Sequence, residues 1–235
     1  MVICLAEGFS EANLVDRLLA PHLGTRGVDM YARIVTTRRD RKAGRVYKGG
    51  GRTIDYYLND LADLYRQWQR HPRVWFTTCL DVYKLPNDFP DRQNAFDIKD
   101  CRRRVERLEE LLTRAAVDKA GMDEKRFIPH LALHEFETLL FADLDALGTL
   151  FPGREREIGQ LKNSVAAFDD IEEINHTENG APSSRIGSKI PVYGKYKASD
   201  QSGAINVLEV ISLPKIRGKC RHFDAWVTRL EQLAS

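Results

Sequence analysis

Two acidic residues follow apolar, strand-like runs of the sequence, at the point where each run ends. Glu7 comes directly after VICLA, and Asp81 comes directly after WFTTCL. In open α/β sheets ligands bind at the carboxyl ends of the strands, where loops diverge and helix amino termini point their N–H groups outward. Two carboxylates at that edge can share a divalent ion such as Mg²⁺ or Mn²⁺, which prefer oxygen ligands. The alternative is that Glu7 only favours a helix amino terminus and Asp81 only caps a turn.

A second acidic group lies in PHLALHEFETLLFAD, where a predicted strand becomes a predicted helix. His134 and Glu137 are three residues apart and therefore share one helical face, whereas Glu135 projects elsewhere. The segment differs from the zinc motif HExxH, because Thr138 occupies the place of the second histidine. An oxygen-rich magnesium or manganese site fits these residues better. An acid-rich helix start with a locally hydrogen-bonded histidine is the alternative.

Two further segments carry groups suited to phosphate. In YKGGGR a glycine triplet is flanked by Lys48 and Arg52. The segment APSSRIGSKIPVYGKYK carries hydroxyls and cations, among them Ser183, Arg185, Lys195 and Lys197. Glycine lets a backbone approach closely, and arginine can hold a phosphate through two parallel hydrogen bonds. Neither segment is a P-loop, since GxxxxGK[ST] is absent, and a glycine triplet alone is equally typical of a flexible turn.

Strand-like and helical stretches that could position these residues alternate along the chain. The β-rich runs lie at residues 2–6, 30–35, 73–80 and 126–133. Apolar residues at helical spacing predict helices in residues 10–19, 53–70, 92–120, 134–147 and 223–233. This alternation predicts an α/β fold, with an open, mainly parallel sheet and helices on both faces.

The carboxyl-terminal part of the chain has a different composition. Glycine, proline, serine and asparagine cluster in residues 152–203, which predicts a loop-rich region. We therefore expect an α/β core in residues 1–150. Residues 151–235 should form a loop-rich segment and a final helix that pack on this core, as one compact domain.

Composition limits the classes of function. The 235 residues include 36 Lys and Arg against 34 Asp and Glu, so any nucleic-acid surface must be a local patch. The four cysteines are far apart without a CxxC motif, which favours reduced thiols over a zinc ribbon or a disulfide framework. The amino terminus does not resemble a signal peptide, and no run reaches the roughly 20 apolar residues that span a bilayer. We expect a soluble, cytoplasmic protein that does not bind membranes.

Taken together, several segments resemble a bacterial family of unknown function with a Toprim-like, Rossmann-like fold. They are AEGFSEANLV, LDVYKLPNDFP, IPHLALHEFETLLFAD, APSSRI, YGKYKASDQSG and CRHFDAWVTRLEQL. Toprim domains catalyse phosphodiester chemistry in topoisomerases, primases and OLD-family nucleases, to which the resemblance is distant. Their magnesium is bound by a glutamate after the first strand and a DxD motif after a later one. Glu7 matches the glutamate and Asp81 the start of DxD, but Tyr83 stands where the second aspartate belongs.

The resemblance also implies roles for the remaining polar residues. OLD-family nucleases recruit extra acids for a second metal, so Glu135 and Glu137 would replace the missing aspartate. Lys195 or Lys197 would stabilise negative charge in the transition state, and Arg185 would position the nucleic-acid backbone.

The predicted function is therefore a metal-dependent nuclease that acts on DNA ahead of RNA. By resemblance it would be the effector of an anti-phage or DNA-repair pair with an SMC-like or ABC-type ATPase, and whether it forms a homo-oligomer is left open. One alternative is a non-catalytic nucleic-acid-binding or regulatory module of that ATPase, which Tyr83 and the near-neutral charge favour. Another is a different magnesium enzyme that acts on a nucleotide or another small phosphate.

Overall fold

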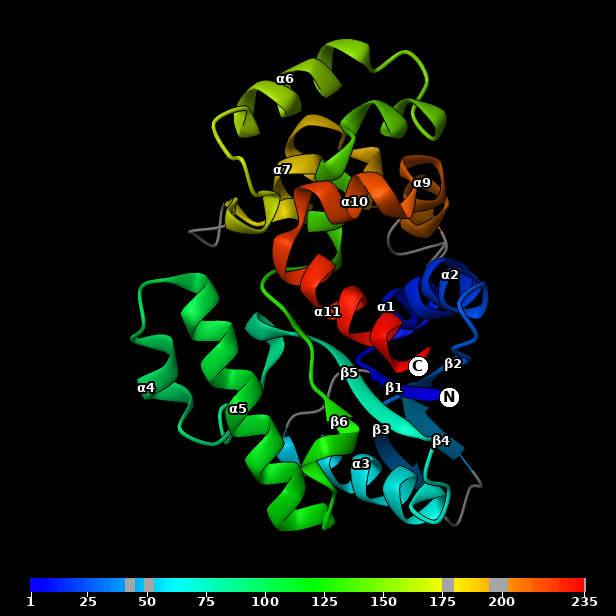
Figure 1. Ribbon diagram of the computed structural model, residues 1–235. Coiled ribbons are helices and arrows are strands. Elements are labelled where there is room, and N and C mark those ends of the chain that lie inside the picture. The colour runs from blue at the N-terminus through cyan, green and yellow to red at the C-terminus, as the bar shows by residue number, and fades with distance from the viewer. Residues whose placement is uncertain (41–44, 49–52, 175–179, 195–202, 235) are drawn as a thin grey trace. The chain divides into compact units, whose positions relative to one another are not determined.

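The computed structural model describes most of the chain, as two compact units (Figure 1). The described residues are 1–40, 45–48, 53–174, 180–194 and 203–234, without the side chains of 37–40 and 45–48. Unit 1 comprises Met1–Ala132 and Thr228–Ser235, and unit 2 comprises Leu133–Val227. The first boundary thus lies after Ala132, whereas the composition of the sequence changes near residue 150.

Unit 1 is built around a parallel sheet with the strand order β2-β1-β5-β6, and β7 also pairs with β5. The strands are β1 (Val2–Ala6), β2 (Met30–Ile34), β5 (Trp75–Asp81), β6 (Phe127–Ile128) and β7 (Leu131–Ala132). All five residues of β1 are buried, as is typical of a central strand covered on both faces. The open, mainly parallel sheet predicted from the sequence is confirmed. A separate antiparallel pair joins β3 (Thr36–Asp40) to β4 (Arg45–Lys48).

Strands β6 and β7 continue one another along β5 in an unchanged register. Pro129 lies in the gap between them and has no N–H to give to the ladder. The hydroxyl of Thr78, which is fully buried, fills the gap. It accepts a hydrogen bond from the His130 N–H and donates one to the His130 carbonyl, each at 3.0 Å. The carboxyl-terminal half of β5 is therefore held in the sheet despite the proline.

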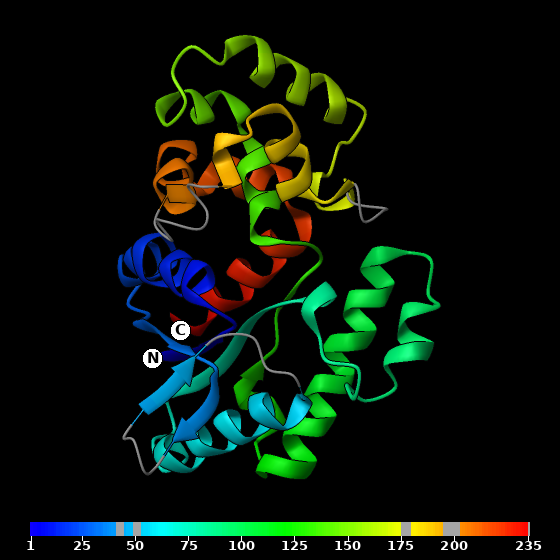
Figure 2. The ribbon, with the colours of Figure 1, turned by 180° about the vertical axis from the view of Figure 1, so that it is seen from behind.

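Helices cover both faces of this sheet, as predicted. Figures 1 and 2 show α1 and α2 on one face and α3 and α5 on the other. Their bounds are α1 (Phe9–Leu14), α2 (Ala20–Gly24), α3 (Ile54–Trp68) and α5 (Cys101–Ala120); a π-helical turn (Val15–Leu19) joins α1 to α2, and a short α4 (Arg92–Phe96) precedes α5. The apolar stripe predicted for α5 is buried, at Val105, Leu108, Leu111 and Leu112. Asp100 caps the start of α5, and Gly121 ends it with a positive φ of 60°.

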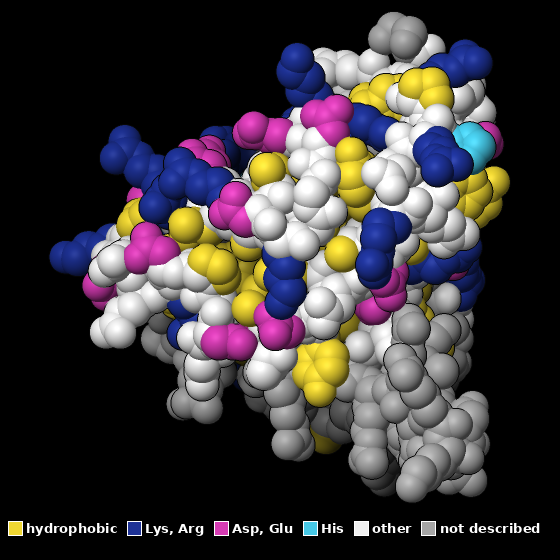
Figure 3. Space-filling model, turned by 90° about the horizontal axis from the view of Figure 1, so that it is seen from below, with side chains coloured by type: hydrophobic (Ala, Val, Ile, Leu, Met, Phe, Trp, Pro, Cys, Tyr) yellow, Lys and Arg dark blue, Asp and Glu magenta, His cyan; other side chains and the backbone are white. Residues whose placement is uncertain are grey.

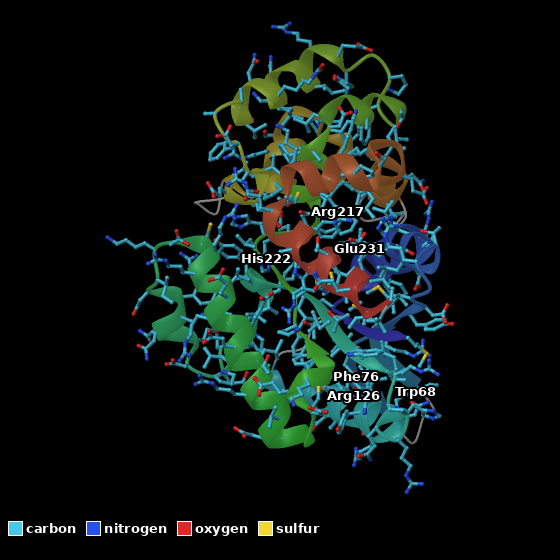
Figure 4. The ribbon with its side chains drawn as sticks, viewed as in Figure 1. Trp68, Phe76, Arg126, Arg217, His222 and Glu231 are labelled. Carbon is cyan, nitrogen blue, oxygen red and sulfur yellow. The ribbon has the colours of Figure 1, made fainter. Side chains whose placement is uncertain are left out.

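Arg126 fastens the segment between α3 and β5. Its guanidinium donates hydrogen bonds to the carbonyls of Gln69, His71 and Val74 at 2.7–2.8 Å. The same group lies over the ring of Phe76, 5.7 Å from its centre (Figure 4). These bonds satisfy the carbonyl of Gln69, the residue directly after α3, and two carbonyls in the segment that leads to β5.

Unit 2 is mostly helical. It contains α6 (Glu155–Val165), α7 (Pro182–Lys189), α9 (Gly203–Ile211), α10 (Leu213–Lys219) and most of α11 (Arg221–Glu231), together with the 3₁₀ segments η4 (Phe136–Ala142), η5 (Leu144–Thr149) and η6 (Ile171–Glu173). The described part of residues 152–203 is therefore more helical than predicted. Pro182 belongs to the first turn of α7, where a helix tolerates proline because no N–H partner is needed.

The single helix predicted for residues 134–147 is wrong. Two 3₁₀ segments lie there, and Asp143 between them is extended, with φ −154°. Its side chain accepts a hydrogen bond from the Asp145 N–H at 3.2 Å and so starts the second segment. Six of the seven residues of η4 are buried, so this segment is enclosed on all sides instead of presenting one apolar stripe. In the described residues, no helix is both long and apolar enough to cross a membrane.

Candidate functional site

Glu7 and Asp81 meet at the carboxyl edge of the sheet in unit 1. The strands that carry them, β1 and β5, are neighbours. Glu7 is 4% exposed and Asp81 is 1% exposed. The Asp81 N–H donates a hydrogen bond to Glu7 Oε2 at 2.9 Å, and the Glu7 N–H donates one to the Cys79 carbonyl at 3.0 Å. The structure thus brings together the two carboxylates that the sequence analysis places at one edge.

Lys84 lies against both carboxylates. Its Nζ is 2.5 Å from Asp81 Oδ2 and 3.6 Å from Glu7 Oε1. Burial opposes the charge on this ammonium, but the two acids outweigh that effect and raise the pKa of Lys84 above its ordinary range. The Lys84 side chain is nevertheless 54% exposed, so a surface lysine is paired with acids that are themselves buried.

A third carboxylate, Glu11, lies on the first turn of α1. It is 6% exposed, and its Oε2 accepts a hydrogen bond from the Gly8 N–H at 2.9 Å. A Cβ at Gly8 would lie only 3.2 Å from this oxygen, so glycine allows the close approach. Burial raises the pKa of both Glu7 and Glu11, and the charge of Asp81 raises that of Glu7 further. Three buried carboxylates and one ammonium therefore form the site, which we call the carboxylate cluster.

Tyr83 lies between Asp81 and Lys84 in the sequence, but its side chain contacts Phe96, whereas Asp81 and Lys84 pair with each other. Its side chain is 44% exposed, and its ring meets Phe96 edge-on with 6.4 Å between the ring centres. The residue at the second acidic position of the DxD pattern therefore contributes an exposed aromatic ring to the loop after β5.

The HEFE acids belong to unit 2 and are hydrogen-bonded there. Glu135 Oε2 accepts a hydrogen bond from the Ser183 N–H at 2.9 Å, at the amino terminus of α7, where a carboxylate is favourable. Glu137 is 4% exposed, and its Oε1 accepts a hydrogen bond from the Tyr193 hydroxyl at 3.2 Å. Burial and the charge of Glu137 raise the pKa of Tyr193. His134, the first residue of the motif, is buried.

The predicted phosphate-binding residues have varied placements. The Arg185 guanidinium donates hydrogen bonds to the carbonyls of Gly180 and Ile174, at 2.7 and 2.9 Å, and so fastens the approach to α7. Ser183 uses its N–H on Glu135, as described above. The remaining predicted cations are Arg52, Lys195 and Lys197, which lie outside the described residues, and Lys48, whose side chain is not described.

Two residues of the carboxylate cluster were not singled out from the sequence, although signals for both exist. Glu11 follows Glu7 by four residues, which is the spacing of one helical turn in EGFSE. Lys84 follows Asp81 by three residues in DVYK, a spacing that allows an ion pair in a helical turn.

Positive and negative side chains are mixed on the surface of the described residues. On the face shown in Figure 3, Lys and Arg side chains are interspersed with Asp and Glu side chains and do not form one continuous stripe. This pattern agrees with the nearly balanced composition of the chain.

Comparison with known protein families gives a match. A family model described as "Domain of unknown function (DUF4276)" matches residues 6–231 and therefore covers nearly the whole chain. Neither the curated proteins nor the solved structures contain a match.

Proposed function

Because the chain belongs to the DUF4276 family, a domain of unknown function, we propose its activity from its own site: a metal-dependent, Toprim-like nuclease that hydrolyses phosphodiester bonds. The observation that carries this proposal is the pair of buried carboxylates, Glu7 and Asp81, around one cationic group at the carboxyl edge of a parallel sheet. This edge is where open α/β folds bind their ligands. The resemblance of the two segments to the Toprim motifs supports the same assignment.

The residues of the carboxylate cluster fit Mg²⁺ or Mn²⁺. Oxygens of Glu7 and Asp81 already approach one positive charge, that of Lys84, and hard divalent ions prefer carboxylate oxygens. A bound ion would supply an activated water and would stabilise the leaving oxygen.

In this proposal, Lys84 would bind the phosphate of the substrate. Its half-exposed side chain can turn away from the two acids without disturbing the core, and its ammonium can then pair with a phosphate oxygen. Glu11 would hold the Gly8 turn, which fixes the direction of the Glu7 side chain.

From the resemblance we propose further roles for residues outside the carboxylate cluster. Glu135 and Glu137 of unit 2, beside His134, would be metal ligands. Lys195 or Lys197 would stabilise transition-state charge, and phosphate would be contacted by Lys48, Arg52, Ser183 and Arg185.

The proposed biological setting is a pair with an SMC-like or ABC-type ATPase, acting on DNA ahead of RNA in defence or repair. This part rests on the resemblance alone. Co-expression of the chain with an ATPase encoded beside it, followed by affinity purification, tests it, and separate elution of the two proteins would contradict it.

The test of the activity is cleavage of labelled plasmid and RNA by purified protein in Mg²⁺, Mn²⁺ or EDTA. We expect metal-dependent cleavage that falls at least about 100-fold in Glu7→Gln and in Asp81→Asn, because each removes a charged ligand oxygen. Glu106→Gln, an exposed change on α5, is the matched control and should cleave like the wild type. An inert wild type, or variants as active as the wild type, would refute the proposal.

A second function is favoured by a specific observation. Lys84 already neutralises part of the acidic charge, and Tyr83 stands in place of an acid, so the cluster could be a purely structural ion pair in a non-catalytic module. Calorimetric titration with Mn²⁺ separates the two functions. Binding that is lost in Asp81→Asn supports the nuclease, and absence of binding in the wild type supports the module.

A further inference from the structure

Two exposed aromatic side chains follow the buried carboxylates closely in the sequence, one after β1 and one after β5. Phe9, two residues after Glu7, is 49% exposed, and Tyr83, two residues after Asp81, is 44% exposed. Among the described residues, Tyr31 is the other large aromatic side chain with comparable exposure, at 48%. Strongly exposed rings are thus concentrated where β1 and β5 end.

Neither of these two rings is buried in the core. Phe9 is the first residue of α1, a position at which burial of a ring is not needed to start a helix. The Tyr83 ring meets Phe96 edge-on, and the Arg92 guanidinium lies 4.2 Å from the centre of the Phe96 ring. Because Tyr83 is 44% exposed, part of its surface is open to a ligand.

The neighbours of the rings indicate what chemistry such a ligand has. A ligand that reaches both rings and the carboxylate cluster meets flat apolar surface beside one ammonium and three acids. A nucleotide unit combines these two properties, because its base offers a flat face and its phosphate offers charge. Bases in a duplex are stacked on each other, whereas bases of a single strand can lie on aromatic side chains.

We infer that the carboxylate cluster receives single-stranded nucleic acid, whose bases stack on Phe9 and Tyr83 while the adjoining phosphate faces Lys84. This inference rests on the proposed function and specifies its substrate class. Phe9 and Tyr83 are then specificity-determining residues that select unpaired nucleotides.

The test measures binding and does not depend on turnover. Fluorescence anisotropy in Ca²⁺ would compare a fluorescein-labelled oligothymidylate with an abasic oligonucleotide of the same length, which keeps the phosphates and lacks the bases. We expect Phe9→Ala and Tyr83→Ala each to weaken oligothymidylate binding about 5- to 150-fold and to leave abasic binding unchanged. Tyr83→Phe keeps the ring and should bind like the wild type.

Tyr31→Ala is the matched control. Tyr31 is as exposed as the two rings but pairs with Ile3 in the sheet, four residues and about 13 Å before the edge at Glu7. It should bind both probes like the wild type. Thermal unfolding of all variants checks that the exposed substitutions leave the fold intact.

Three results would overturn the inference: unchanged binding in both alanine variants, an equal loss for the abasic probe, or a preference for a labelled duplex over the single strand. The nuclease proposal fails separately. A wild type that cleaves nothing but binds oligothymidylate through both rings refutes the nuclease and upholds the single-strand surface. A wild type that cleaves while both variants bind normally refutes the inference alone.

Discussion

At the scale of single residues, the carboxylate cluster combines buried acids with one half-exposed cation. Removing a carboxylate from water is costly unless a charge or hydrogen-bond donors compensate it. Glu7 has the Asp81 N–H and Lys84, Asp81 has Lys84, and Glu11 has the Gly8 N–H. Burial raises the pKa values of Glu7 and Glu11, and neighbouring acids, which outnumber the ammonium, raise them further.

Lys84→Met should leave Glu7 and Asp81 without their cation. We expect the free energy of unfolding at neutral pH to fall by about 1 to 3 kcal/mol, less than for a fully buried pair because Lys84 is half-exposed. Mn²⁺ should restore part of the loss, and urea unfolding with and without Mn²⁺ measures both effects. Lys119→Met, which removes an exposed pair with Asp55, should cost less than about 1 kcal/mol. A variant that Mn²⁺ does not stabilise would count against a metal at these acids.

Glu11→Gln should change how stability depends on pH. Burial raises the pKa of Glu11 above the ordinary value of 4.5, so the folded state binds more protons than the unfolded state between that value and the raised one. Stability contributed by this group is therefore fully present below pH 4.5 and is lost as the pH rises from there through the folded pKa. In urea unfolding across this range, the wild type should lose more stability than Glu11→Gln. Glu106→Gln should keep the wild-type pH profile, and an identical profile for Glu11→Gln would contradict the prediction.

At the scale of elements, the position of the cluster depends on how β5 is held. Asp81 ends this strand, and the strand beside it is interrupted at Pro129. Thr78 lies three residues before Asp81, and its hydroxyl bridges the interruption by hydrogen bonds to the backbone of His130. A side-chain hydroxyl thus links the two strands close to the site, where their backbone pairing is interrupted.

Thr78→Val tests this bridge, since valine keeps the branched shape and lacks the hydroxyl. The change leaves the buried N–H and carbonyl of His130 without this partner, so we expect the free energy of unfolding to fall by about 1 to 3 kcal/mol in urea unfolding. In the matched control Thr113→Val, the lost hydroxyl bonds only the Glu109 carbonyl within α5, and the cost should be smaller. Equal costs in the two variants would show that the bridge has no special importance.

At the scale of the whole molecule, the two units are composed differently. Unit 2 is one continuous stretch of the chain, whereas unit 1 needs Thr228–Ser235 to be complete. Within unit 1, Leu230 is fully buried, and Glu231, labelled in Figure 4, pairs with His22 at 2.6 Å and Arg26 at 3.2 Å. The carboxyl-terminal turns therefore close the unit that begins at the amino terminus.

The division of the chain into these two units predicts which fragments fold on their own. A fragment of residues 133–227 contains the whole of unit 2 and should unfold cooperatively in circular dichroism. A fragment of residues 151–235, cut at the change in composition, lacks η4 and η5, which pack against α9 and α6, and should not. The reverse outcome, with only the second fragment folded, would support the boundary at residue 150.

Much of the architecture could be predicted from the sequence because it depends on local patterns. Apolar runs separated by amphipathic stretches indicate parallel strands and covering helices. The stripe of α5 is buried, and that of α3 is buried in its amino-terminal half, from Ile54 to Leu61. The segment around HEFE was mispredicted because burial on all sides, not one apolar stripe, determines its conformation. The first turn of α7 was missed because a proline there is compatible with a helix start as well as with a loop.

By itself, the sequence determined that acids follow two strand-like runs, that Glu11 lies four residues beyond Glu7, and that Lys84 lies three residues beyond Asp81. These are distances along the chain, which local geometry converts into positions at the end of a strand or on a helix face. Only the tertiary structure decided that β1 and β5 are neighbours, that Lys84 reaches both acids, and that Phe9 and Tyr83 stay exposed. The reason is that burial and ion pairing depend on which strands lie next to each other, and strand order is set by the packing of the whole sheet.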